Sequence, residues 1–173
     1  MNIQFKQLVE DNISDFELIT KWDNDVETKY FIRPNFKEGE IEDIGVDELI
    51  AHFKSINPKF IYIILYNGIK IGYVSVESNV EHLYTKDKNS AWISICIGEK
   101  EYRGMGIGEY AMGFLEEKSK KLNCDRIELG VFEYNKTARA FYEKIGYTAI
   151  AIIKDFVYYN GQWRNDIRME KNI

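Results

Sequence analysis

The chain has 173 residues, of which 45% are hydrophobic and 14% aromatic, a composition that excludes a disordered or fibrous protein. Its formal net charge of -5 leaves no overall basic field to attract a nucleic-acid backbone. No stretch approaches the ~18 uninterrupted apolar residues of a membrane-spanning helix, and the first residues lack the apolar core of a signal peptide. We therefore expect one domain over residues 1–173, with neither membrane nor nucleic acid as a partner.

The first elements predicted along the chain are a strand and two helices. Residues 3–8 form a short strand, and residues 14–17 (Ser-Asp-Phe-Glu) match the capping box that starts a helix. Apolar residues at helical spacing between 46 and 53 predict a second helix, which Asn57-Pro58 ends.

A hairpin and a third strand follow. Residues 60–66 and 69–76 are β-rich and flank Asn67-Gly68, the positive-φ pair of a tight turn. Residues 81–90 are polar and predict a loop, after which residues 92–97 alternate as a strand.

The next unit is a strand, a glycine-rich turn, a helix and a strand. Five apolar residues share one stripe of a helix that runs to about residue 123: Ile107, Tyr110, Ala111, Phe114 and Leu115. Residues 127–131 alternate as the following strand, which should be parallel to strand 92–97.

The last elements are a helix and a second hairpin. Asn135 can cap a helix that Gly146 ends, and residues 147–159 and 163–169 flank Asn160-Gly161. The whole order predicts a mixed α/β sheet of about seven strands with flanking helices.

The glycine-rich turn is the strongest candidate for a binding site. It consists of Arg103, Gly104, Met105, Gly106, Ile107 and Gly108. Glycines at the start of a helix leave backbone N–H groups open to an anion such as a diphosphate, and the arginine would reinforce the attraction. One alternative is that the glycines only make a tight turn. Another is a dinucleotide-binding turn, although Glu109 stands where its third glycine belongs.

Two motifs in this region resemble the GNAT superfamily of N-acetyltransferases. Its coenzyme A signature is Gln or Arg, two residues, Gly, one residue, and Gly or Ala, positions that Arg103, Gly106 and Gly108 fill. Residues 135–147 look like its second signature, an Asn, a small residue, a Tyr and a Gly before an aromatic residue. Looser similarity outside this core, at residues 22–25 and 159–169, resembles the branch of ribosomal-protein alanine and spermidine acetyltransferases.

The resemblance implies an enzyme that passes the acetyl group of acetyl-coenzyme A (acetyl-CoA) directly to an amine. It also implies a mostly antiparallel sheet in which one parallel pair of strands splays, so that main-chain groups of Ile95, Cys96 and Ile97 reach the pantetheine and thioester. We expect the side chains of these three residues to be ordinary core.

The departing sulfur needs a proton donor, and Tyr142 is the candidate because of its place in the second signature. Alternatively, Tyr142 is one more core aromatic among the twelve tyrosines of the chain. Asn135 can cap its helix, contact the coenzyme, or do both.

The acceptor ammonium must lose a proton, to a carboxylate or through water. Glu77 is favoured over Glu128, a strand residue whose common fate is to face solvent. His52 and His82 are isolated, and Cys96 and Cys124 are the only cysteines, so we expect no metal site or disulfide framework and a reducing cytoplasm.

Six acidic residues cluster in and before the second predicted helix: Glu38, Glu40, Glu42, Asp43, Asp47 and Glu48. They would draw a cationic amine or simply form a solvated face. The expected acceptor is a small-molecule amine, such as a polyamine, or a peptide N-terminus. A non-catalytic acyl-CoA-binding module remains the alternative function, and exposed β-edges near the C-terminus allow a homodimer.

Overall fold

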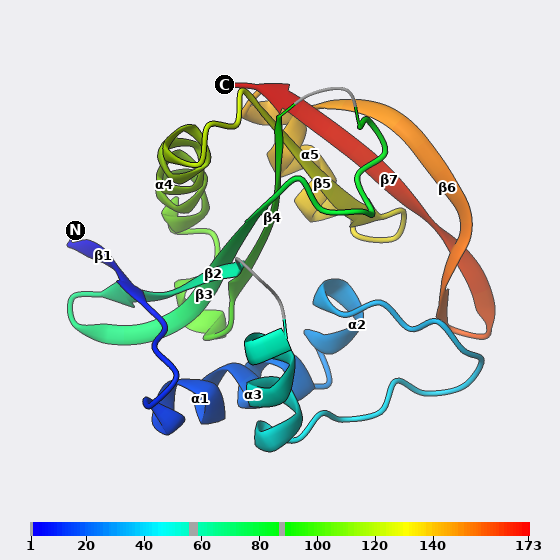
Figure 1. Cartoon of the computed structure of the whole chain (residues 1–173). Helices are drawn as coiled ribbons and strands as arrows, with labels where there is room; N and C mark the ends of the chain where they lie inside the picture. Colours follow the sequence, from blue (N-terminus) through cyan, green and yellow to red (C-terminus); the bar gives the residue numbers. More distant parts are fainter. Residues whose placement is uncertain (1, 56–58, 87–88) are drawn as a thin grey trace.

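The computed structural model describes residues 2–55, 59–86 and 89–173. Within these residues, seven strands form one sheet in the order β1-β2-β3-β4-β5-β7-β6, with helices on both faces (Figure 1). The strands are β1 (Ile3–Gln7), β2 (Lys59–Tyr66), β3 (Ile69–Ser78), β4 (Ser90–Ile97), β5 (Arg126–Phe132), β6 (Thr148–Tyr159) and β7 (Gln162–Asn172). The helices are α1 (Ile13–Asn24), α2 (Lys29–Ile32), α3 (Val46–Ser55), α4 (Ile107–Lys121) and α5 (Lys136–Lys144), with a 3-10 turn at Lys100–Tyr102.

Every neighbouring pair of strands is antiparallel except β4 and β5, which are parallel. The predicted mixed, mostly antiparallel sheet of seven strands is therefore confirmed. Across the described residues, no helix combines the length and apolar character needed to cross a bilayer.

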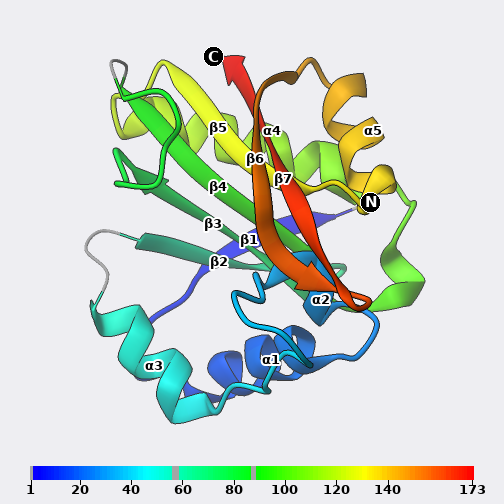
Figure 2. The ribbon, with the colours of Figure 1, turned by 90° about the vertical axis from the view of Figure 1, so that its right-hand side faces the viewer.

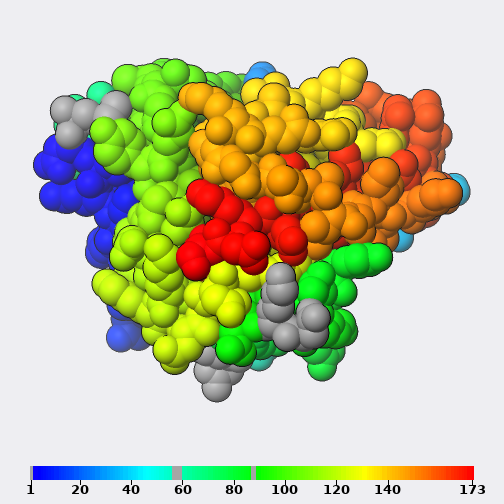
Figure 3. All heavy atoms as spheres, turned by 90° about the horizontal axis from the view of Figure 1, so that it is seen from above, coloured from blue at the N-terminus to red at the C-terminus, as the bar shows by residue number. Residues whose placement is uncertain are grey.

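The two faces of the sheet carry different helices, α4 and α5 on one and α1, α2 and α3 on the other (Figure 2). The α4 face buries alternate strand residues such as Val74 and Leu129 against Ala111 and Leu115. Viewed from above, the C-terminal end of β7 lies beside α4 (Figure 3), where Lys171 pairs with Glu116 at 2.6 Å.

The parallel pair is short. The register of β4 and β5 holds for three pairs, from Ser90 opposite Arg126 to Trp92 opposite Glu128. Beyond Trp92 the strands diverge (Figure 1), so residues 93–97 of β4 have no partner in β5. We call this opening the β4–β5 gap.

Both predicted hairpins are confirmed. Asn67 and Gly68 have φ of 48° and 85°, and Asn160 and Gly161 have φ of 52° and 76°, the left-handed pairs that two-residue hairpin turns require.

Two local predictions are wrong, and one element was missed. Helix α1 begins before Ser14, whose hydroxyl donates to the Asn12 side chain instead of capping the helix. Tyr110 is 59% exposed, and Met112 takes its place in the core. The four-residue α2 was not predicted. The stop at Asn57-Pro58 lies outside the described residues.

Candidate functional site

The glycine turn has an open backbone at the start of α4. Gly104 and Gly106 have φ of 75° and 78°, and a Cβ added to either would meet no heavy atom within 4 Å. Gly106 is the N-cap of α4, and no side chain caps the helix there. The unpaired N–H groups of this first turn, with the positive end of the helix dipole, make a cradle that fits a diphosphate.

The third glycine of the turn serves packing. A Cβ on Gly108 would lie 3.1 Å from the Phe141 ring, so this glycine lets α5 approach the first turn of α4. Lys144 of α5 also pairs with Glu109, which neutralises the carboxylate nearest the turn. Ile107 is a core residue, 1% exposed, whereas Met105 is 41% exposed.

Arg103 braces the turn. Its Nε donates to the carbonyl oxygen of Ile97 at 2.9 Å, and its Nη2 donates to the carbonyl of Gly98 and to the hydroxyl of Thr28, both at 3.1 Å. The expectation was a guanidinium directed at phosphate. Instead, most of its donors hold the end of β4 and the start of α2.

The residues of β4 that are predicted to reach the pantetheine and thioester of the coenzyme border the β4–β5 gap. Ile95, Cys96 and Ile97 all lie past the last β4–β5 pair, so their β5-facing main-chain groups have no strand partner. Cys96 is buried, and desolvation, with a smaller contribution from the Asp23 carboxylate, raises the pKa of its thiol to about 12. The Cys96 side chain is core, as predicted, whereas Ile95 and Ile97 are partly buried and pack against the core on the α4 face.

Tyr142 lies in α5, on the α4 face, and Asn135 is the N-cap residue of that helix. Tyr142 is 8% exposed and its ring packs against Phe141 and Tyr147. Burial raises its pKa to about 12, so the phenol keeps its proton at neutral pH. Asn135 caps α5, its side chain accepting from the Ala138 amide at 3.2 Å, as predicted.

Glu77 lies on the opposite face of the sheet from Tyr142. It stands opposite Trp92 in the β3–β4 register, next to the pair Ser75 and Ser94, whose hydroxyls are 2.6 Å apart. Ser94 is exposed although β4 is a central strand, so the sheet is uncovered there. Tyr142 and Glu77 therefore lie on different faces of the sheet.

Glu128 does not face solvent, which corrects the sequence prediction. It is fully buried, pairs with Arg126 at 2.5 Å, and accepts from the Tyr84 amide at 2.7 Å. Because its oxygens hold the segment before β4, it is a structural residue. His82 packs its ring against Trp92 at 4.5 Å between centroids.

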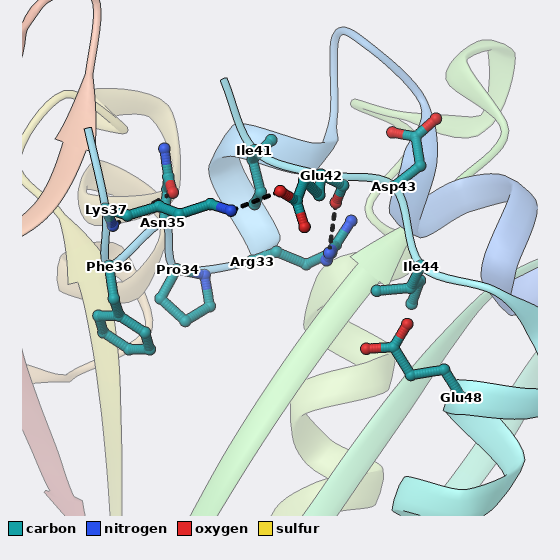
Figure 4. A pocket seen from close by; sticks show the side chains of 10 residues that line it. All are labelled: Arg33, Pro34, Asn35, Phe36, Lys37, Ile41, Glu42, Asp43, Ile44 and Glu48. Carbon is teal, nitrogen blue, oxygen red and sulfur yellow. Dashed lines mark hydrogen bonds and ion pairs between the residues drawn. The ribbon is translucent and has the colours of Figure 1, made fainter. Parts of the chain in front are cut away.

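The acidic residues before α3 are partly neutralised. Glu42 pairs with Lys37 at 2.5 Å and Asp43 with Lys29 at 2.9 Å. A pocket in this segment contains Arg33 and Lys37 as well as acids (Figure 4). It is therefore of mixed charge, and the predicted attraction for cations is weaker than the sequence implies.

Helix α2 and the residues it touches were missed from the sequence. The Tyr134 hydroxyl donates to the carbonyl of Tyr30, and the Tyr134 ring stacks on Tyr159 with centroids 4.1 Å apart. Thr28 is the N-cap residue of α2. A four-residue helix is too short for a periodicity signal, and only the Asp25-x-x-Thr28 spacing hints at its start.

Comparison with known proteins gives the family to which this fold and this glycine-rich turn belong. The acetyltransferase (GNAT) family matches residues 17–147, so this chain belongs to that family. The family is one of acetyltransferases, and one solved structure of this fold, a putative acetyltransferase from Salmonella typhimurium (TM-score 0.76 at 14% identity), is that of the protein with its cofactor acetyl-CoA.

Curated relatives match only in part. The uncharacterized N-acetyltransferase MJ1530 of Methanocaldococcus jannaschii is 33% identical over 100 residues, which cover 57% of this chain and 59% of that protein. An uncharacterized N-acetyltransferase of Lactobacillus delbrueckii subsp. lactis is 28% identical over 89 residues, 51% of each chain. The alignments thus span little more than half of these relatives.

Solved structures share the fold over nearly the whole chain. Spermidine N-acetyltransferase from Vibrio cholerae, in complex with CoA and spermine, has a TM-score of 0.78 at 21% identity, covering 98% of this chain and 95% of that one. Ribosomal-protein-alanine N-acetyltransferase from Brucella melitensis has a TM-score of 0.73 at 16% identity and covers 100% of both chains. At these identities the likeness concerns the fold alone.

Proposed function

We propose that the chain is a single-domain N-acetyltransferase that passes the acetyl group of acetyl-CoA directly to a primary amine. The observation that carries this proposal is the open turn at Gly104 and Gly106, which continues from the stretch of β4 without a β5 partner. An anion cradle next to main-chain groups without a β5 partner suits a coenzyme with a diphosphate at one end and an amide-containing arm leading to a thioester.

In this proposal the amides of residues 104–108 hold the diphosphate, and the main chain of Ile95, Cys96 and Ile97 binds the arm. Tyr142 donates a proton to the departing sulfur, a role supported by its protonated phenol. Asn135 contributes its amide near the start of α5 while it caps that helix.

Glu77 is proposed to receive the proton of the acceptor amine. It lies beside Ser94, where the face of the sheet opposite α4 is uncovered. Coenzyme and acceptor would then reach the β4–β5 gap from opposite faces, which lets an amine approach the thioester carbonyl without passing the coenzyme arm.

The acceptor is proposed to be a polyamine, another small-molecule amine or a peptide N-terminus. The spermidine and ribosomal-protein-alanine acetyltransferases with this fold support that range without choosing within it. The two buried thiols, Cys96 and Cys124, support a cytoplasmic location. A homodimer through the edge strand β6 stays a prediction.

Thiol release from acetyl-CoA tests the proposal. The enzyme is incubated with spermidine, a small monoamine and a peptide with N-terminal alanine, each against a no-amine blank. We expect release with at least one amine. Coenzyme binding without release for any amine would favour the acyl-CoA-binding module, and absence of coenzyme binding would remove both.

A further inference from the structure

Helix α2 lies on the face of the sheet opposite α4 (Figure 1), where it packs against β4 and contacts Tyr134, which follows β5. On the β5 side, Tyr134 donates to the carbonyl of Tyr30, and the rings of Phe31 and Tyr134 are 5.7 Å apart. On the β4 side, the N-cap Thr28 accepts from Arg103. This short helix therefore forms one wall of the side from which we propose the amine enters.

Hydrogen bonds and an ion pair link the start of α2 to the residues at and just before the glycine-rich turn. Thr28 is 7% exposed, and its hydroxyl accepts from Arg103 Nη2 at 3.1 Å while donating to Asp25 Oδ1 at 2.9 Å. Lys100 and Glu27 form an ion pair at 2.7 Å alongside. The turn and the wall of the amine side thus share one network of contacts.

The guanidinium of Arg103 has a donor to spare. Nε and Nη2 hold Ile97, Gly98 and Thr28, whereas Nη1 makes no hydrogen bond among the described residues, and the side chain is exposed. A planar guanidinium can hold a phosphate oxygen on one nitrogen while its others keep their partners, which an ammonium cannot do with the same geometry.

We infer that Arg103 is a positioning residue that couples the two substrates, with Nη1 on a coenzyme phosphate and Nη2 holding the start of α2 through Thr28. This inference rests on the proposed function. A phosphate on Nη1 immobilises the guanidinium, which in turn fixes α2 for the amine. By thermodynamic linkage the effect is reciprocal. Bound coenzyme raises the affinity for the amine by the same factor as bound amine raises the affinity for the coenzyme.

Calorimetry with free CoA and the amine that the wild type acetylates fastest measures this factor. The Kd of the amine is determined without CoA and with saturating CoA, and the ratio is the coupling. We expect a ratio of about 5 or more in the wild type, the lower end of usual couplings. In Thr28→Val the ratio should fall to about 1, while the Kd of CoA alone changes less than about twofold, because the turn itself is untouched.

Two further variants make the test specific. Thr20→Val is the matched control, since the Thr20 hydroxyl is buried without a hydrogen-bond partner, and it should keep the wild-type ratio. Arg103→Lys keeps the positive charge but loses the planar guanidinium, so its ratio of amine Kd values without and with CoA should also fall to about 1. The double variant with Thr28→Val should show the same ratio as either single variant. Circular dichroism confirms that each variant is folded.

A wild-type ratio near 1, or an unchanged ratio in both Thr28→Val and Arg103→Lys, would overturn the coupling. Either result could occur in an enzyme that acetylates amines normally, which leaves the proposed function intact. Failure of the proposed function has a different signature, the absence of thiol release in the wild type with every amine. A general loss of packing would weaken the amine equally with and without CoA and leave the ratio unchanged.

Discussion

Replacement of Gly106 by aspartate should separate coenzyme binding from folding. A Cβ there meets nothing within 4 Å, so bulk alone causes no clash, and φ of 78° strains Asp and Asn alike. Both residues are favoured helix N-caps and tolerate left-handed backbone better than most, so the net cost in stability should be about 1 kcal/mol or less. The fold should survive in both variants.

The new carboxylate would face the diphosphate. At about 5 Å and an effective dielectric constant of about 20, the repulsion between two unit charges is about 3 kcal/mol. We therefore expect Gly106→Asp to bind CoA about 100-fold more weakly than its neutral counterpart Gly106→Asn, with similar melting temperatures. Titration calorimetry measures both, and the difference should shrink as salt is raised. Equal affinities of the two variants for CoA would refute the placement of the diphosphate at this turn.

Three other perturbations test separate parts of the molecule. Tyr142→Phe should lower kcat about 100-fold with little change in the Kd of CoA, because only a proton donor is lost. The steady-state rate of thiol release gives kcat. Gly98→Ala should cost about 3 kcal/mol in urea unfolding, because its Cβ would lie 2.2 Å from Cγ of the buried Trp22. Glu99→Gln should cost about 1 kcal/mol at pH 7, because hydrogen bonds from Lys21 and Trp22 hold the pKa of Glu99 below its ordinary value.

The sign of the last effect sets its pH dependence. Since the folded-state pKa of Glu99 is lowered, its contribution is present at neutral pH and is lost as the pH falls through that value. The stability difference between wild type and Glu99→Gln should therefore narrow toward pH 3, and a constant difference would contradict the ion-pair explanation.

For Gly98→Ala, the control is Gly45→Ala, since a Cβ at Gly45 meets nothing within 4 Å. An unchanged kcat in Tyr142→Phe would remove this residue from the chemistry.

Local chemistry made most of the fold predictable. The Asn-Gly pairs at 67–68 and 160–161 need positive φ, which few other residues adopt, so each hairpin could be placed from two letters. The parallel pair followed from the strand, turn and helix around Gly106. Periodicity was less informative at Tyr110, because a helix stripe does not say where the core ends, and the aromatic ring lies outside it.

The site was predictable where the backbone decides it and unpredictable where tertiary partners do. Three glycines beside an arginine predicted an anion cradle, but not that Gly108 is reserved for Phe141 or that Arg103 turns toward Thr28. Glu128 was misjudged because a strand carboxylate usually faces water, and only the fold reveals the buried Arg126 that pairs with it.

The brevity of the parallel register has a mechanical meaning. The two parts of the sheet, β1 to β4 and β5 to β6, are paired at only three residue pairs, so few backbone bonds fix their relative position. The span between the two parts is then governed by side chains packed beneath them and by one small helix across the opening. Substitutions in that packing should therefore change the width of the β4–β5 gap as well as the stability of the core.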